Sequence, residues 1–126
     1  MGLSFAMLTL RNPRISNREP VEVEAHADTG ATYLIIPEHV RLQLDLDEVS
    51  QKEIQLADGA KRKVPYVGPI EVKFKNRLAY VGAIVMGDQV LLGAIPMEDM
   101  DLIVIPQQRC VDINPLNPNY AAALAK

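Results

Sequence analysis

Hydrophobic and polar residues alternate along most of this chain, in short runs separated by turn-forming residues. From Val21 to Ala27, every second residue is apolar and the residues between are glutamate or histidine, which is typical of a strand with one buried face. The same pattern predicts strands at Leu3–Arg11, Pro20–Ala27, Tyr33–Ile36, Glu53–Ala57, Arg62–Tyr66, Pro69–Lys75, Leu78–Met86, Gln89–Leu92, Leu102–Ile105 and Cys110–Ile113. Many short strands with turns between them predict a small all-β barrel.

One or two short helices and a hairpin complete the expected elements. The segment Pro37–Leu42 predicts a short surface helix, and Ala94–Asp101 predicts another, with a proline in its first turn and acids near its N-terminus. The dipeptide Asp58-Gly59 predicts a two-residue turn, because this pair favours tight hairpin connections. It would join the apolar run 54–57 to the strand that follows Lys61.

Length and composition set the domain organisation. A chain of 126 residues with 48% hydrophobic content can form one domain with a real core, but it is too short for two such lobes. We expect the domain to span residues 1–113. Residues 114–126 form a Pro, Asn and Ala-rich tail that is either an extension of a dimer interface or partly disordered.

The net charge and the distribution of apolar residues argue against a nucleic-acid partner and against a membrane-spanning segment. The formal net charge is -3, whereas phosphate binding favours a basic excess, so we expect no nucleic-acid partner. Lys61-Arg62-Lys63 is the one tight basic run, either a solvated rim or a contact for an acidic peptide or a partner subunit. No stretch reaches the roughly 18 apolar residues of a membrane span, and Leu78–Met86 is expected to be a buried strand. We expect a cytoplasmic protein without a membrane partner.

Neither a thiol centre nor a metal centre is predicted. Cys110 is the one cysteine, so it forms no internal disulfide, which fits a reducing compartment. We expect it to be a buried or interface thiol. His26 and His39 lack metal-site spacing, and the acidic runs 45–48 and 98–101 lack the glycine expected midway through a calcium loop. No metal or other cofactor is expected.

The candidate chemistry lies in Asp28-Thr29-Gly30-Ala31, directly after the strand that ends at Ala27. A carboxylate at such a turn can activate water, but peptide hydrolysis of this type needs two carboxylates that share one proton. Because the motif occurs once, the site would need a second chain. Gly30 is expected to adopt a backbone conformation that a Cβ resists, and Thr29 to form a buried hydrogen bond. The tripeptide alone is also an ordinary turn sequence.

The order of these parts resembles the retropepsin-like aspartic proteases, and looks closest to small stand-alone prokaryotic-type members. The resemblance runs from about Leu3 to Ile113: an Asp-Thr-Gly-Ala turn, a flap-like hairpin, an apolar segment ending in glycine, a helix and a terminal strand. It implies a retropepsin-like acid-protease barrel in which each chain supplies half of the site and homodimerisation completes it. It also implies that termini join the subunits, with Cys110–Ile113 as the candidate strand.

The resemblance assigns roles residue by residue. Asp28 matches the catalytic aspartate. The residues that would support its turn are Thr29, Gly30, Leu91, Leu92 and Gly93. The residues that would contact substrate are Ala31, Thr32, Asp58, Gly59 and Ala60, of which the last three match the flap tip.

Two positions depart from many retroviral members. Those members have an acid after the Asp-Thr-Gly-Ala turn and an arginine after the later glycine, where this chain has Thr32 and Ala94. Because both partners of that ion pair are absent, no charge is left unpaired, and the sequence remains compatible with the retropepsin-like fold. Dimer strength and substrate preference are the properties that this departure affects.

The resemblance implies an aspartic endopeptidase that hydrolyses peptide bonds with water activated by Asp28 from two chains. A second interpretation is a non-catalytic dimeric β-barrel that binds peptides or a partner protein. A third is that the turn is accidental and the chain is another small β-domain. The expected partners under the first interpretation are a second copy of the chain and a peptide or protein substrate.

Overall fold

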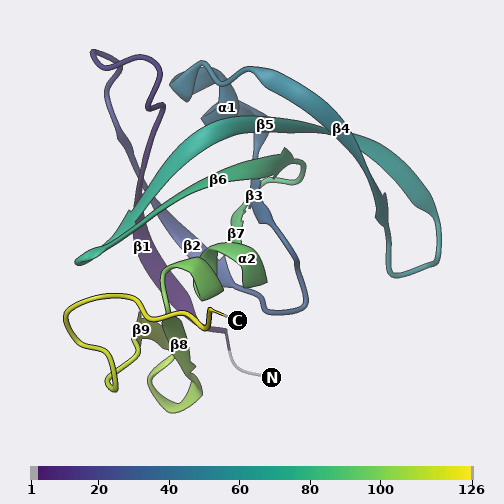
Figure 1. Cartoon of the computed structure of the whole chain (residues 1–126). Coiled ribbons are helices and arrows are strands. Elements are labelled where there is room, and N and C mark those ends of the chain that lie inside the picture. Colours follow the sequence, from purple (N-terminus) through teal and green to yellow (C-terminus); the bar gives the residue numbers. More distant parts are fainter. Residues whose placement is uncertain (1–2, 126) are drawn as a thin grey trace.

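The computed structural model describes residues 3–125 and is dominated by β-strands (Figure 1). The strands of this part of the chain are β1 (Phe5–Arg11), β2 (Val21–Ala27), β3 (Leu34–Ile36), β4 (Glu48–Gln55), β5 (Lys61–Phe74), β6 (Arg77–Val85), β7 (Val90–Leu92), β8 (Leu102–Ile105) and β9 (Cys110–Ile113). The helices are α1 (Glu38–Leu44), α2 (Ala94–Asp99) and the single 3₁₀ turn η1 (Pro106–Gln108).

Six of the strands close into a barrel, which confirms the all-β fold class. The order β5-β6-β3-β7-β2-β1 is closed by the antiparallel pairing of β1 with β5, where Leu10 lies opposite Val72. β4 continues the sheet outward from β5, and β9 and β8 continue it from β1. The β4–β5 hairpin therefore projects from the barrel on the side where the connection between β2 and β3 lies (Figure 1).

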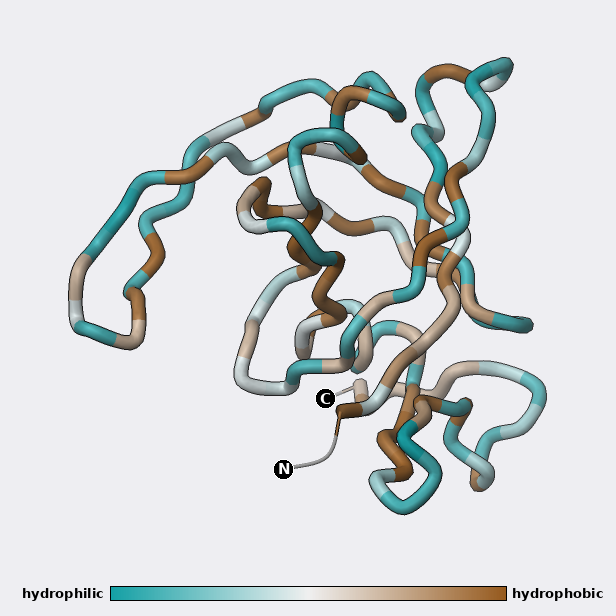
Figure 2. Tube along the Cα trace, turned by 180° about the vertical axis from the view of Figure 1, so that it is seen from behind, coloured by the Kyte–Doolittle hydropathy of each residue, from teal (hydrophilic) through white to brown (hydrophobic). Residues whose placement is uncertain are grey.

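Strand alternation produces the core. In β1, Ala6, Leu8 and Leu10 are buried, and the residues between them are half-buried or exposed. Burying a leucine side chain stabilises the fold by about 1.5–3 kcal/mol, so each such strand contributes strongly to closure. Hydrophobic residues accordingly concentrate along the inner strands, whereas the projecting hairpin is mostly hydrophilic with isolated apolar residues (Figure 2).

Three strand predictions need correction. β4 begins at Glu48 rather than Glu53, and β5 is one strand of 14 residues rather than two. The dipeptide Gly68-Pro69 suggested a break, but β5 only shifts register there and stays paired with β6 on both sides of the shift. The segment 78–86 is not wholly buried, because Leu78 and Tyr80 are 48% and 57% exposed.

Both predicted helices form. α1 buries Val40 and Leu44 against the barrel. α2 begins after Gly93 and ends at Asp99, so Glu98 and Asp99 lie at its C-terminal end rather than near its N-terminus as expected. No helix within residues 3–125 is long and apolar enough to cross a membrane.

The C-terminal segment is bonded to the body of the chain, although the large apolar side chains of its tail are exposed. β9 lies between β1 and β8, so β8 is the open edge of the sheet at this end. The expectation that Cys110–Ile113 joins two subunits concerns a second chain and stays a prediction. The carboxylate of Asp101 accepts hydrogen bonds from the side chains of Asn114 and Asn117 and from the Ala122 N–H. These bonds tether the tail to the chain just after α2.

The tether gives a pH-dependent prediction. Hydrogen bonds from the Ala122 N–H, then from Asn114 and Asn117, hold the pKa of Asp101 below its ordinary value of 3.8. A carboxyl whose pKa is lowered in the tethered state stabilises that state at every pH above its ordinary pKa. This contribution is lost as the pH falls through the lowered pKa. The protection factors of residues 114–125, which compare the observed exchange rate with the intrinsic rate at the same pH, should therefore fall at strongly acidic pH.

Asp101→Asn should accelerate the same exchange at neutral pH. Asp101 has a left-handed backbone, φ 53°, which asparagine tolerates, so the substitution removes the charge and one acceptor oxygen without backbone strain. Asp99→Asn, at the exposed end of α2, is the matched control and should leave tail exchange unchanged. Equal exchange in the native protein and in both variants would show that Asp101 does not hold the tail.

Candidate functional site

The Asp28 turn, residues 28–31, follows β2 directly and presents its carboxylate to solvent. The Asp28 N–H donates to the Leu92 carbonyl at 3.0 Å, and the Ala31 N–H donates to the Asp28 carbonyl at 3.0 Å. Asp28 Oδ1 accepts the Gly30 N–H at 3.0 Å. One carboxylate oxygen is therefore fixed by the turn itself, and no hydrogen bond from the described residues occupies Oδ2.

β7 lies between β2 and β3 in the sheet and holds the Asp28 turn through both strands. It pairs in parallel with β2, where Ala27 lies opposite Leu92, and antiparallel with β3, where Ile35 lies opposite Leu91. The two strands that flank the Asp28 turn are thus fixed to the same central strand. Leu92 is fully buried, so the support rests on core packing as well as on backbone pairing.

Gly93 allows the start of α2 to lie directly against the turn. A Cβ at Gly93 would clash with the Tyr33 carbonyl oxygen and would lie 2.8 Å from that of Ala31. The close approach lets the Ala94 N–H donate to Ala31 O at 2.8 Å and the Ile95 N–H donate to Thr32 O at 2.9 Å. The structure therefore places Leu91, Leu92 and Gly93 where a support for the turn must lie.

One expectation about the turn is corrected, and the expectation for Thr29 stays a prediction that only a second chain can test. Gly30 is not in the left-handed region of backbone conformation. Its constraint is instead a close contact, because a Cβ there would lie 3.2 Å from Asp28 Oδ1. Thr29 is exposed, and no residue among 3–125 forms a hydrogen bond with its hydroxyl. Within one chain, Thr29 thus makes no buried hydrogen bond.

Two concave spaces meet at Gly30. The turn-side pocket has a volume of about 570 Å³ and is lined by Leu3, Ser4, His26, Ala27, Asp28, Thr29, Gly30, Leu91, Val104 and Pro106. The hairpin groove has a volume of about 420 Å³ and is lined by Gly30, Ala31, Thr32, Tyr33, Ile35, residues 52–56, Ile84 and Met86. Ala31 and Thr32 therefore line a groove beside the candidate carboxylate.

The predicted flap-tip residues lie apart from this groove. Asp58, Gly59 and Ala60 are exposed at the tip of the β4–β5 hairpin and line neither space. The tip is a three-residue loop rather than the expected two-residue turn, because the Leu56 N–H bonds to Ala60 O and Gly59 adopts φ +88°. The Asp58 side chain accepts the Ala60 N–H and so belongs to the loop itself.

Sequence reasoning missed a cluster in the hairpin groove. The Lys52 ammonium lies 4.7 Å from the ring centroid of Tyr66 and 5.3 Å from that of Tyr33. The two rings meet edge to face, with centroids 5.6 Å apart. Part of this cluster could have been predicted from the sequence. Alternation along the strand places Lys52 on the same face of β4 as the apolar Ile54, which indicates a lysine on the inner face of the hairpin.

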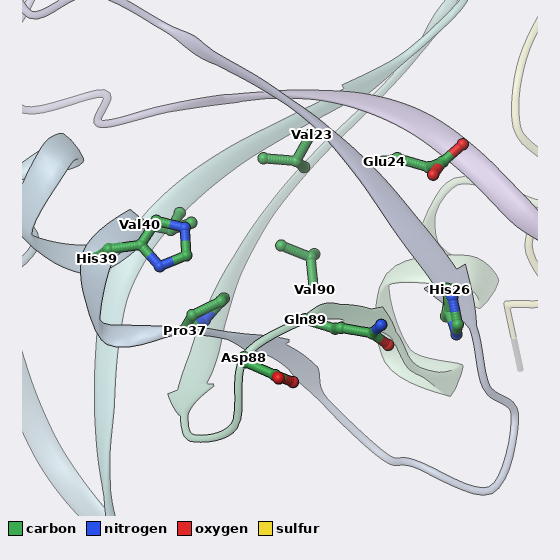
Figure 3. A pocket seen from close by; sticks show the side chains of 9 residues that line it. All are labelled: Val23, Glu24, His26, Pro37, His39, Val40, Asp88, Gln89 and Val90. Carbon is green, nitrogen blue, oxygen red and sulfur yellow. The ribbon is translucent and has the colours of Figure 1, made fainter.

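A third pocket contains polar side chains but carries no comparable arrangement (Figure 3). It has a volume of about 260 Å³, includes Glu24, His26, His39 and Asp88, and does not include Asp28. Its titratable side chains are spread around the rim rather than directed at a common point (Figure 3). Within residues 3–125, no group of three or more His, Cys, Asp or Glu side chains is arranged to hold a metal ion.

Comparison with known proteins adds no assignment. No protein-family model matches the chain, and no curated protein matches it.

Two glycine substitutions test how the turn is held. Gly93→Ala should destabilise the protein by about 1–3 kcal/mol, because the added carbon meets backbone atoms that cannot rotate away. The backbone of Gly93, φ -86°, is open to alanine, so the loss would arise from the contact alone. Gly30→Ala is the matched control on the exposed side of the turn and should cost less than about 1 kcal/mol. Urea unfolding measures both.

Proposed function

We propose that this chain is an aspartic endopeptidase of the retropepsin-like type, active as a homodimer. The observation that supports the proposal best is the fixed, solvent-facing carboxylate of Asp28, held by β7 and α2 at the junction of two concave spaces. The turn sequence, its place after β2 and the hairpin that projects on the same side all agree with the resemblance seen in the sequence.

The surroundings of Asp28 favour a second copy as the missing half of the site. Leu3 is 54% exposed in the turn-side pocket, and Val104 and Pro106 extend the same apolar lining. β8 adds an open sheet edge next to this surface. Two-fold pairing across such a surface would bury apolar area and bring two Asp28 turns together.

Two such carboxylates would work as one acid–base unit. At close range they cannot both ionise without large repulsion, so they hold one proton between them and titrate as a pair. The ionised carboxylate accepts a proton from a water molecule as that water attacks the scissile carbonyl carbon. The protonated carboxylate donates its proton to the carbonyl oxygen, which yields a tetrahedral diol. In the collapse of the diol, the carboxyl that took the water proton gives it to the leaving amine as the C–N bond breaks. The other carboxylate takes a proton from a diol hydroxyl, which restores the starting pair.

The hairpin groove would bind the substrate beside the dyad. An extended peptide can hydrogen-bond to the backbone of strands that flank such a groove, and a hairpin above it excludes water from the reacting bond. Ala31 and Thr32 would contact the peptide from the turn. Asp58, Gly59 and Ala60 would reach substrate only if the hairpin tip moved toward the dyad.

Asp28→Asn should abolish peptide cleavage with little effect on folding. Asparagine keeps the oxygen that accepts the Gly30 N–H, so the turn can persist, but it can neither accept nor supply the catalytic proton. We expect a loss of about 10²–10⁴-fold or more in kcat/KM. The assay is a diverse peptide library incubated from pH 3 to 7, with cleavage products identified by mass spectrometry.

Asp88→Asn is the matched control, because Asp88 is an exposed carboxylate in the β6–β7 turn. It should cleave like the native protein. Equal cleavage by the native and Asp28→Asn proteins would remove Asp28 from the mechanism. Specific peptide binding with no turnover at any pH would favour the non-catalytic binding module instead.

Assembly is the second test of the proposal. Sedimentation should show a dimer at micromolar concentration, and Val104→Asp should shift it to monomer, because a charge would enter the apolar lining beside Asp28. Activity should fall with the dimer fraction. Leu42→Asp, on the exposed face of α1, is the control and should leave the dimer intact. A strictly monomeric protein that still cleaves peptides would contradict a shared site.

A further inference from the structure

The hairpin groove has one charged side chain fixed on its inner surface. Lys52 is half-buried, contacts the faces of Tyr33 and Tyr66, and forms no ion pair with any carboxylate in residues 3–125. A cation over aromatic rings is held electrostatically by the ring faces. Its N–H donors that point away from the rings remain available to an acceptor in the groove.

The packing of Tyr66 fixes this arrangement. The Tyr66 ring end lies against Gly82 of β6, in the space that a Cβ at that position would occupy. The ring is thus seated on the barrel wall on one side and meets the edge of Tyr33 on the other. Because the ammonium is already positioned, little side-chain freedom would be lost when it contacts a ligand.

The two faces of the hairpin differ in charge. Paired residues of an antiparallel sheet project to the same side, so Lys52 shares a face with Val64, and Ile54 shares it with Arg62. Glu53 pairs with Lys63 on the opposite, exposed face. The hairpin face that carries Lys52 therefore also carries Ile54. Glu53 borders the same groove, but strand alternation directs its side chain to the opposite, exposed face of β4.

The hairpin as a whole is also basic. Residues 52–63 contain four cations and two carboxylates, in a chain whose formal net charge is -3. Apolar side chains of Ile35, Ile84 and Met86 line the rest of the groove. The chemistry that matches this surface is an extended peptide with an acidic side chain next to apolar ones.

We propose that Lys52 is a specificity-determining residue that selects peptides with an acidic side chain seated in the hairpin groove. The inference rests on the proposed peptidase function, since it names the substrate class of that same site. Lys52 would contact the substrate carboxylate directly, away from the scissile bond, while Ile54 packs against a neighbouring apolar side chain.

Matched peptides test the inference. A synthetic peptide set carries Glu, Gln or Lys at each position in turn, and kcat/KM is measured for each. At one position the native protein should prefer Glu over Gln by about fivefold, the scale of a partly exposed ion pair. Lys52→Gln should remove this preference, and Lys52→Arg should retain it because the charge is kept.

Lys63→Gln is the control, because it removes the same charge from the exposed face of the same hairpin. It should retain the preference for Glu. If Lys52→Gln instead slows the Glu and Gln peptides equally, Lys52 supports the fold of the groove and the inference is wrong. A preference that survives in Lys52→Gln would also overturn it.

A binding measurement separates this inference from the proposed function. The same peptides, labelled with fluorescein, are titrated with Asp28→Asn protein and with the Asp28→Asn, Lys52→Gln double variant. A Glu preference in the first and not in the second supports Lys52, even if the native protein cleaves nothing and the peptidase proposal fails. Cleavage without a Glu preference leaves the peptidase standing and overturns the role of Lys52. If the protein neither binds nor cleaves any of the peptides, both the peptidase proposal and the role of Lys52 are wrong.

Discussion

The close approach of β7 and the start of α2 to the Asp28 turn is the constraint on which the site depends. β2 and β3 leave the turn in different directions, and each is bonded to β7, so the turn is fixed at both of its ends. Gly93 lets the α2 backbone lie against the carbonyls of Ala31 and Tyr33, a contact that a larger residue would prevent. A carboxylate held in this way keeps its position without help from a ligand.

Rigid and projecting parts of the chain meet in the hairpin groove. One wall is the Asp28 turn, which is bonded to the barrel core, and the other is the β4–β5 hairpin, which extends beyond it (Figure 1). The hairpin has no buried residue from Asp47 to Lys63, and such segments open more readily than core strands. The fold therefore combines a fixed position for Asp28 with a groove wall that can adjust its shape.

Local sequence pattern was enough to predict these elements: strand alternation predicted the barrel, and turn and helix signals predicted the Asp28 turn and both helices. It failed where pairing overrides local propensity. Gly68-Pro69 is a strong break signal, yet β5 continues through it because neighbouring strands bond to it on both sides. The Lys52 cluster joins three segments that are distant in the chain, so spacing alone could not show that Tyr33 and Tyr66 meet there.

Gly82 extends the site beyond the residues that line it. It belongs to β6 and is not part of the hairpin groove, yet its missing side chain is what lets the Tyr66 ring reach its place beside Lys52. A methyl group at this position would push the ring outward and move the ammonium with it. If Lys52 selects the ligand as proposed, evolution can alter that selectivity by a substitution at Gly82 while every residue that lines the groove stays the same.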